Sequence, residues 1–225
     1  MSTQFVLTSV GLVAFAYLFG SLSPSVFLGK IIKHLDVREH GSGNAGTTNA
    51  FRVLGVRLGI AVLVCDILKG VIPVLAARLI LGDEGNGPFI TVLVTFACVA
   101  GHNYSLFLRG RGGKGVATGA GAALAMMPLP MSLVVALFII LLLTTRIVSL
   151  ASIACTVAFP VAAVALRQPW PYVGVCCLIS VVVLWAHRAN MKRLWHRTEP
   201  RVVFPWNRRP TERAESGQVE NGAGE

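Results

Sequence analysis

The sequence predicts an all-α, polytopic integral membrane protein with seven transmembrane helices, its N-terminus outside and its C-terminus cytoplasmic. Three observations predict this fold class. Hydrophobic residues make up 54% of the 225 residues and charged residues only 13%, whereas a soluble domain carries about 25% charged residues. The chain contains seven long apolar stretches, and most Lys and Arg residues lie between alternate stretches. This composition excludes a disordered chain, a collagen-like chain and a disulfide-stapled secreted module.

The apolar stretches are compared with the ~20 residues that cross a hydrocarbon core of ~30 Å as a helix. They cover residues 5–32, 56–81, 88–108, 116–127, 131–145, 148–166 and 172–187. The first has no basic residue before Lys30 and therefore lacks the positive start of a signal peptide, so we expect it to be retained. The fourth and fifth are short and are separated only by residues 128–130, so one kinked span is an alternative to two.

Positive charge decides between six and seven spans. The chain has 20 Lys and Arg against 10 Asp and Glu, a net charge of +10. With seven spans and the N-terminus outside, every basic residue except Lys69, Arg78 and Arg167 lies in or beside a cytoplasmic segment. Six spans would place the basic tail outside, against the positive-inside rule. This distribution indicates a membrane protein, and we expect no nucleic-acid partner.

The apolar stretches form one unit that is followed by a polar tail. We expect residues 1–202 to be a single membrane domain, and residues 203–225 to be a disordered C-terminal tail of polar composition. All five cysteines lie in apolar stretches without metal-ligand spacing, so we interpret them as small core residues.

The first of three polar segments that the topology places on the cytoplasmic side is residues 38–52. Glycines here let backbone N–H groups curl around an anion, and Arg52 offers a planar fork suited to phosphate. A flexible interhelical loop is the alternative. The G-x-G-x-x-G spacing is fortuitous, since no strand precedes it. The candidate phosphate ligands of the segment are Gly41, Gly43, Asn44, Thr48 and Asn49, with Ser42 as a further hydrogen-bonding group.

The second segment, residues 109–115, leads into the predicted helix at 116. Glycines before a helix N-terminus present free N–H groups and the positive end of the helix dipole to an anion. The candidate ligands are Gly112, Gly113, Lys114 and Gly115. It is not a Walker A loop, because Gly115 stands where Ser or Thr would hold Mg²⁺. A positively charged turn is the alternative interpretation.

The third segment follows the last apolar stretch and contains His187, Asn190 and Glu199. His187 and Asn190 are three residues apart and share a face if the helix continues to that point. A histidine at a membrane boundary is more often an interfacial anchor than a catalyst.

Ionisable residues within the apolar stretches are costly and are functional by default. Asp66 and Lys69 form an expected i,i+3 pair, and His102 lies near the inner end of the third stretch. A purely structural pairing of Asp66 with Lys69 is the alternative.

These segments resemble the three motifs of the bacterial acyl-phosphate:glycerol-3-phosphate acyltransferases, the PlsY family. The similarity is carried by the runs 41–52, 101–115 and 187–199, with Gly20-Ser21, Pro24 and the run 66–70 also similar. It extends in order over about residues 11–202. The chain departs from the family pattern at Ala189, where an acidic residue is common, and at Ser105, where Pro is common.

The resemblance implies transfer of a fatty acyl group from acyl phosphate to the sn-1 hydroxyl of glycerol 3-phosphate, giving lysophosphatidic acid. It implies that Ser42 and Arg52 are needed for activity and that Gly112, Gly113, Lys114 and Gly115 bind glycerol 3-phosphate. It makes His187 and Asn190 a functional pair, with Glu199 in a structural role. The sites expected are therefore catalytic at Ser42, Arg52, His187 and Asn190, with Asp66, Lys69, His102 and Glu199 supporting them.

In this reaction the leaving group is a phosphate, and its developing negative charge has to be neutralised. Lys114, Arg52 and backbone N–H groups could neutralise it. We favour proton transfer to a substrate phosphate oxygen with His187 positioning the substrate, over His187 as general base. No carboxylate cluster suggests a metal, so we expect neither metal nor cofactor.

Two other functions are kept as alternatives. A transporter of a phosphorylated small solute would also present Gly, Lys and Arg at a membrane face. A structural membrane subunit would explain the spans but not the three motifs. We expect a monomer in the bacterial cytoplasmic (inner) membrane, with acyl phosphate, glycerol 3-phosphate and membrane lipids as partners and the active site facing the cytoplasm.

Overall fold

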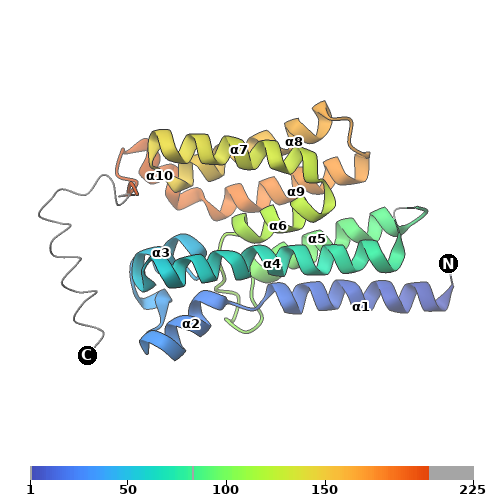
Figure 1. The fold of residues 1–225 in the computed structure, drawn as a ribbon, viewed down its shortest axis with the longest axis horizontal. Helices are drawn as coiled ribbons and strands as arrows, with labels where there is room; N and C mark the ends of the chain where they lie inside the picture. Colours follow the sequence, from blue (N-terminus) through green and yellow to red (C-terminus); the bar gives the residue numbers. More distant parts are fainter. Residues whose placement is uncertain (1, 83, 203–225) are drawn as a thin grey trace, which may run out of the picture.

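The computed structural model describes residues 2–82 and 84–202, in which all regular elements are helices. The predicted tail, residues 203–225, lies outside the described residues. The elements are α1 (Thr3–Gly20), α2 (Pro24–Lys33), the 3₁₀ turn η1 (Val37–Glu39), α3 (Thr47–Leu54), α4 (Val56–Leu81), α5 (Gly87–Asn103), α6 (Val116–Met126), α7 (Pro128–Thr145), α8 (Val148–Ala165), α9 (Trp170–Ala186) and α10 (Arg188–Trp195). The long helices lie side by side along one axis (Figure 1).

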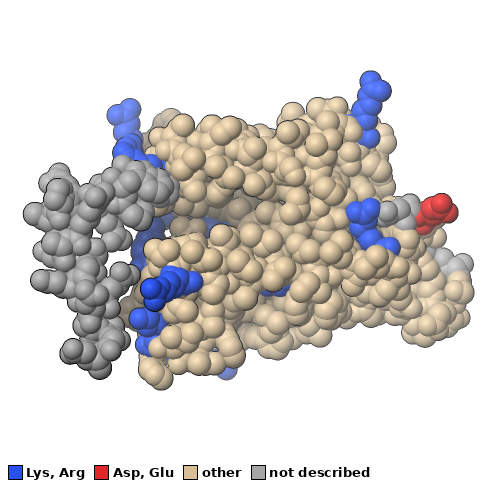
Figure 2. Space-filling view, in the orientation of Figure 1, with Lys and Arg blue, Asp and Glu red and all other residues tan. Residues whose placement is uncertain are grey.

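The surface of the bundle has the pattern of a protein that crosses a lipid bilayer. Large apolar side chains are exposed along the flanks, such as Leu7 at 64%, Leu79 at 83% and Ile140 at 59%. Lys and Arg side chains gather at the two ends of the bundle and leave most of the flank between them uncharged (Figure 2). Apolar side chains exposed in this way are stable when lipid covers them, so the chain is a multi-pass membrane protein.

Four helices, α1, α4, α7 and α8, are long and apolar enough to cross a membrane, and α9 with α10 makes a fifth if this pair, bent by 61°, is one span. Helices α5 and α6 are apolar but shorter. At 11 residues, α6 is about 16 Å long at 1.5 Å per residue. The all-helical prediction is confirmed for the described residues, while the number of seven spans stays a prediction.

The polar segments 34–55, 104–115 and 187–202 meet at one end of the bundle, which we call the loop end. Lys114, just before α6, donates a hydrogen bond to Asn190 of α10. Val202 N–H donates to the carbonyl of Arg146, just after α7, over 2.7 Å. Helix α6 therefore leaves the loop end and α7 returns to it. For residues 116–145 the sequence left open one kinked span or two. The structure has a helical hairpin there, in which α6 is the shorter helix.

The first apolar stretch, expected as one span over 5–32, is two helices. Helix α1 ends at Gly20 and α2 begins at Pro24, which has no N–H to continue the ladder. The break leaves carbonyls without helical partners, and Lys69 Nζ donates to one of them, Leu22 O, over 2.6 Å. The buried lysine thus stabilises a helix break that periodicity alone did not predict.

Glycines let α6 lie directly against α4. A Cβ on Gly70 would overlap the carbonyl oxygen of Thr118, and one on Gly121 would overlap that of Ile67. Small residues at such crossings let backbones approach closely in membrane proteins. This packing holds α6, and with it the Gly-rich segment before it, against the middle of the bundle.

Candidate active site

The three polar segments that the sequence singled out come together at the loop end. Lys114 donates to Asn190 Oδ1, and Asn190 Nδ2 donates to Glu199 Oε1 over 2.6 Å. A Cβ on Gly46 would lie 3.9 Å from the Cα of Gly113. The first segment therefore adjoins the second, and the second is hydrogen-bonded to the third.

Asn49 organises the first segment. Its amide donates to the carbonyl of Val37 over 2.7 Å and to that of His40 over 3.1 Å, while its Oδ1 accepts from Ser42 N–H over 2.8 Å. The side chain is 1% exposed. The sequence expected Asn49 to bind substrate, but its donors and acceptor are occupied, so its contacts are those of a residue that shapes the loop.

Other groups of this segment are also engaged. Asn44 Oδ1 accepts from Gly46 N–H over 2.9 Å, and Gly43 N–H donates to the carbonyl of His40 over 3.1 Å. Gly41 adopts φ +62°, and a Cβ there would overlap Asn49 Oδ1. The side chains of Ser42, Thr48 and Arg52 remain exposed, so they are the groups of the segment that a ligand could reach.

Two helix N-termini lie at the junction of the first two segments. Helix α3 begins after Gly46 and α6 after Gly115, which caps α6 at φ +80° and ψ 0°. The first N–H groups of a helix have no acceptor within the helix, and the dipole adds positive potential there. The closeness of Gly46 to Gly113 brings two such ends to one place, beside Lys114.

The glycines of the second segment are held against α5. Gly112 N–H donates to the carbonyl of Asn103 over 3.2 Å, and Gly113 N–H donates to that of His102 over 3.0 Å. These two N–H groups are therefore not free for an anion, contrary to the sequence expectation. A Cβ on Gly113 would overlap His102 Nε2, so the absence of a side chain is needed for close packing.

A buried polar cluster lies beneath these loops. Asp66 accepts from Thr47 Oγ1 over 2.8 Å and pairs with Lys69 at 2.9 Å, which confirms the expected i,i+3 pair. His102 Nδ1 lies 3.7 Å from Asp66 Oδ1 and 3.0 Å from Thr118 Oγ1. The cluster joins the start of α3, the middle of α4, the end of α5 and the start of α6, so its contacts support the loops.

Lys114 is the half-buried cation of the site. Burial lowers the pKa of its ammonium group to about 8; Glu199 raises that pKa, and the charges of Arg193 and Arg52 lower it further. A bound phosphate would restore the charge on Lys114 by adding the missing negative partner. Arg52 is exposed on α3, close enough for its charge to act on Lys114.

The chain bends at His187, just before the short helix that carries Asn190. Helix α9 ends at Ala186 and α10 starts at Arg188, so the helix does not continue straight, yet both side chains are buried, at 3% and 5% exposed. His187 Nδ1 lies 2.8 Å from the carbonyl of Val183. A carbonyl only accepts, so Nδ1 carries the hydrogen, and Nε2 of the neutral ring is an acceptor.

Glu199 fastens this segment to its neighbours. It accepts from Ser149 Oγ over 2.7 Å, from Asn190 Nδ2 over 2.6 Å and from Arg193 Nε over 2.6 Å. Burial acts to raise the pKa of its carboxyl, but these hydrogen bonds outweigh it and hold the pKa below its usual value. These contacts fit the structural role that the resemblance implied for Glu199.

Four side chains that the structure shows in contact with the site residues are not among the predicted site residues: Thr47, Thr118, Ser149 and Arg193. Thr47 lies inside the first polar segment, so its position in the sequence already indicated that it belongs to the site. Ser149 begins an apolar stretch 50 residues before its partner Glu199, and periodicity carries no information about such a pairing. Among the described residues, no group of three His, Cys, Asp or Glu is placed to hold a metal ion.

The two departures from the family pattern lie outside these contacts. Ala189 is exposed. Ser105 Oγ donates to the carbonyl of Ser21 over 2.6 Å and accepts from Leu108 N–H over 3.3 Å. Its hydroxyl therefore orders the turn after α5 and the break after α1.

Comparisons with known proteins show which family the chain is similar to. The family described as "Glycerol-3-phosphate acyltransferase" matches residues 10–197. Relatives of that name from Gloeobacter violaceus and Bacillus subtilis are both 38% identical; the matches cover 88% and 86% of this chain, and 96% and 97% of theirs. Two crystal structures of PlsY (YgiH), an integral membrane glycerol 3-phosphate acyltransferase in glycerol 3-phosphate and lysophosphatidic acid forms, are 34% identical. They match with TM-scores of 0.82 and 0.80 over 87% of this chain and 96% of theirs.

Proposed function

The chain belongs to the glycerol-3-phosphate acyltransferase family, and we propose that it transfers a fatty acyl group from acyl phosphate to the sn-1 hydroxyl of glycerol 3-phosphate. The products are lysophosphatidic acid and inorganic phosphate. Family membership makes the chain an acyltransferase that acts on glycerol 3-phosphate. Acyl phosphate as donor, and the roles of single residues, are the proposal.

The convergence of the three polar segments carries this proposal. Two helix N-termini, those of α3 and α6, adjoin Lys114, and Lys114 is held by Asn190. Such a site suits a phosphate dianion, because free N–H groups and a partly desolvated ammonium group both favour negative charge. Lys114, Arg52 and the first N–H groups of these two helices are the groups we assign to the substrate phosphates.

In the reaction, the sn-1 hydroxyl oxygen of glycerol 3-phosphate attacks the carbonyl carbon of acyl phosphate. The bond between that carbon and the phosphate oxygen then breaks. Negative charge develops on the carbonyl oxygen and on the leaving phosphate. Preorganised cations and N–H groups stabilise that charge without reorganisation. Binding both phosphates in one site also aligns the two reacting groups.

The hydroxyl proton needs an acceptor. We assign it to an oxygen of a substrate phosphate, with the exposed Ser42 hydroxyl and His187 Nε2 orienting the substrate. The Nδ1–H of His187 is fixed on Val183 O, which holds the ring in one orientation and leaves Nε2 as an acceptor. His187 as general base is the competing assignment.

For topology we retain seven spans, with the N-terminus outside and the C-terminus cytoplasmic. The start of α1 and helix α10 lie at opposite ends of the bundle (Figure 1), as an odd number of crossings requires, and in this proposal the α6–α7 hairpin counts as two crossings. The protein would then be a monomer of the bacterial inner membrane, with residues 1–202 as its membrane domain and its active site facing the cytoplasm.

One assay tests the activity. Purified protein is given acyl phosphate and labelled glycerol 3-phosphate without CoA, and lysophosphatidic acid is measured. We expect product to form with acyl phosphate alone. Product that forms only with acyl-CoA would refute the proposed donor. Solute uptake by vesicles without product would instead favour the transporter alternative, which family membership does not support.

A further inference from the structure

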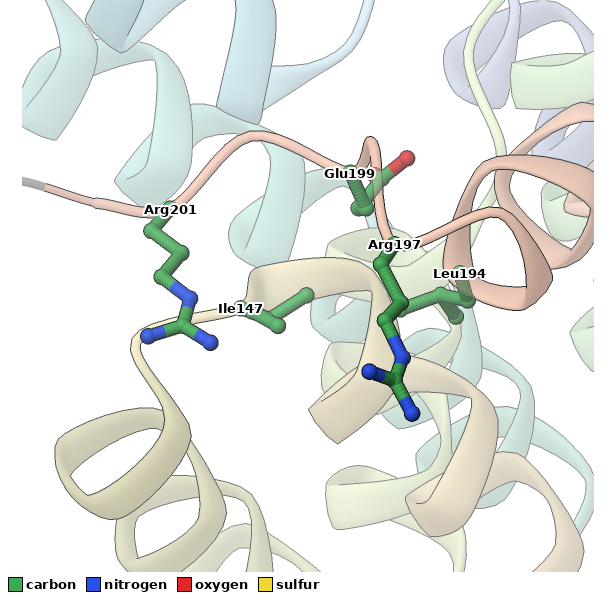
Figure 3. A pocket seen from close by; sticks show the side chains of 5 residues that line it. All are labelled: Ile147, Leu194, Arg197, Glu199 and Arg201. Carbon is green, nitrogen blue, oxygen red and sulfur yellow. The ribbon is translucent and has the colours of Figure 1, made fainter.

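A second basic site lies beside the candidate active site, where the chain passes over the turn between α7 and α8. It is a pocket of about 340 Å³ lined by Ile147, Leu194, Arg197, Glu199 and Arg201 (Figure 3). Two hydrogen bonds fix its wall: Val202 N–H to the carbonyl of Arg146 and Ser149 Oγ to Glu199. The pocket is therefore an ordered part of the loop end.

The charge balance of this pocket is positive. Arg197 and Arg201 are exposed, and no ion pair joins either to a carboxylate within residues 2–82 and 84–202. Figure 3 shows the two guanidinium groups on either side of Ile147, with the Glu199 carboxylate directed away from them. That carboxylate already accepts from three donors, so it does not neutralise the two arginines.

The pocket also has features of a lipid-facing site. Ile147 and Leu194 give it apolar walls, and Trp195, the next residue, is 87% exposed. Exposed tryptophans are typical of the membrane–water interface. Arginine forks match the oxygens of a phosphate, and basic residues beside a bilayer attract anionic headgroups.

Its position separates it from the catalytic groups. Glu199 lies between the pocket and Asn190, which in turn holds Lys114. Glu199 and Asn190 therefore separate a ligand held by Arg197 and Arg201 from the phosphate site that we assign to Lys114. This favours a resident lipid over a reacting substrate.

We propose that this pocket binds the phosphate headgroup of an anionic phospholipid of the surrounding bilayer. Arg197 and Arg201 hold the phosphate, while Ile147 and Leu194 contact the start of the acyl chains. The inference rests on the membrane location of the chain and on this geometry, and does not require acyl phosphate to be the donor.

Native mass spectrometry of the detergent-purified full chain, titrated with phosphatidic acid or phosphatidylcholine, tests the proposal. The double variant Arg197→Gln/Arg201→Gln should bind phosphatidic acid roughly 30-fold more weakly, since each of the two cations near an anionic lipid contributes ~1 kcal/mol and about 1.4 kcal/mol corresponds to tenfold in affinity. Phosphatidylcholine binding should not change. The matched control, Lys33→Gln/Arg57→Gln, removes two exposed charges elsewhere and should retain wild-type binding.

Three outcomes would overturn the proposal. An equal loss of phosphatidic acid binding in Lys33→Gln/Arg57→Gln would show that the lipid is attracted by the overall positive charge and not by this pocket. Displacement of phosphatidic acid by millimolar inorganic phosphate would show an anion site without lipid selectivity. A tenfold higher KM for acyl phosphate in the Arg197→Gln/Arg201→Gln variant would reassign the pocket to the donor. An unchanged KM together with weakened phosphatidic acid binding supports the proposal and shows that the variant is folded.

Discussion

At the scale of single residues, the site contains cations in different surroundings. Arg52 is exposed on α3. Lys114 is half-buried against Asn190, and burial lowers its pKa to about 8. Lys114 is therefore the cation of the proposed phosphate site whose charge changes near physiological pH.

We expect kcat/KM for glycerol 3-phosphate to fall as pH rises through about 8. Below that pH Lys114 is charged and binds the phosphate; above it the free enzyme loses this charge. The substrate phosphate stays a dianion, since its second pKa is about 6. Between pH 7 and 9 the loss should be about tenfold, measured from initial rates.

Variants at Lys114 provide the controls for this pH profile. Lys114→Arg keeps its charge and should remove the decline between pH 7 and 9, even if its overall rate is lower. Lys114→Ala should raise KM for glycerol 3-phosphate more than it lowers thermal stability. An unchanged profile in Lys114→Arg would show that another group titrates.

Ser42→Ala should remove most activity, about 100-fold in kcat, while the thermal midpoint stays unchanged. The Ser42 hydroxyl is exposed, and its backbone N–H makes the structural contact, with Asn49. A lost hydrogen bond to the transition state typically has this effect. Paired kinetics and thermal unfolding measure both quantities.

Asn49→Ala is the matched comparison. It leaves the buried Val37 carbonyl without its partner, at a cost of about 1–3 kcal/mol, and it also removes the part-buried bonds to His40 O and Ser42 N–H. It should lower stability and activity together. Equal thermal destabilisation by Ser42→Ala would refute the separation of roles.

At the scale of elements, the conformation of the second segment, residues 109–115, depends on its close packing against the end of α5. Gly113 lies against the imidazole of His102, which is itself held by Thr118 of α6 and lies beside Asp66 of α4. A side chain at 113 would therefore have to displace a ring that is fixed from two other helices.

Gly113→Ala should lower kcat/KM at least 100-fold, because its Cβ overlaps His102 Nε2 and shifts Lys114. The cause is steric, since Gly113 is not among the residues with positive φ. Gly11→Ala, in open space on α1, is the control and should be neutral. His102→Ala in the Gly113→Ala background should restore part of the activity; no recovery would contradict the steric account.

At the scale of the whole molecule, the fold gathers polar loops at one end of an apolar bundle. Breaks in the helices produce this arrangement: α1 and α2 are separated at residues 21–23, α6 and α7 turn back at Met127, and α9 and α10 are bent by 61°. The short α6 brings its N-terminus and Lys114 to the loop end, while α7 completes the return.

The proposed topology predicts opposite labelling of two cysteines in a chain without its native cysteines. Asn86→Cys, in the turn between α4 and α5, should react with an impermeant thiol reagent in intact cells. Thr198→Cys, after α10, should react only after permeabilisation. Both positions are exposed, so accessibility reports the side of the membrane. Labelling of both from the same side would contradict an odd number of spans.

Composition and the length of the apolar stretches predict the helical class and the membrane location, because both reflect burial in lipid directly, and the polar runs between the stretches predict the segments that meet at the loop end. The motifs also indicate Ser42, Arg52, Lys114 and His187 as candidate site residues, and their roles stay predictions. Which polar groups of these segments are free to bind a ligand is visible only once the helices are packed. Gly112 and Gly113 N–H groups and the Asn49 amide are engaged internally, and Glu199 is bonded to Ser149. Such pairings join residues far apart in the chain, and they depend on how the helices pack, which local sequence patterns do not encode.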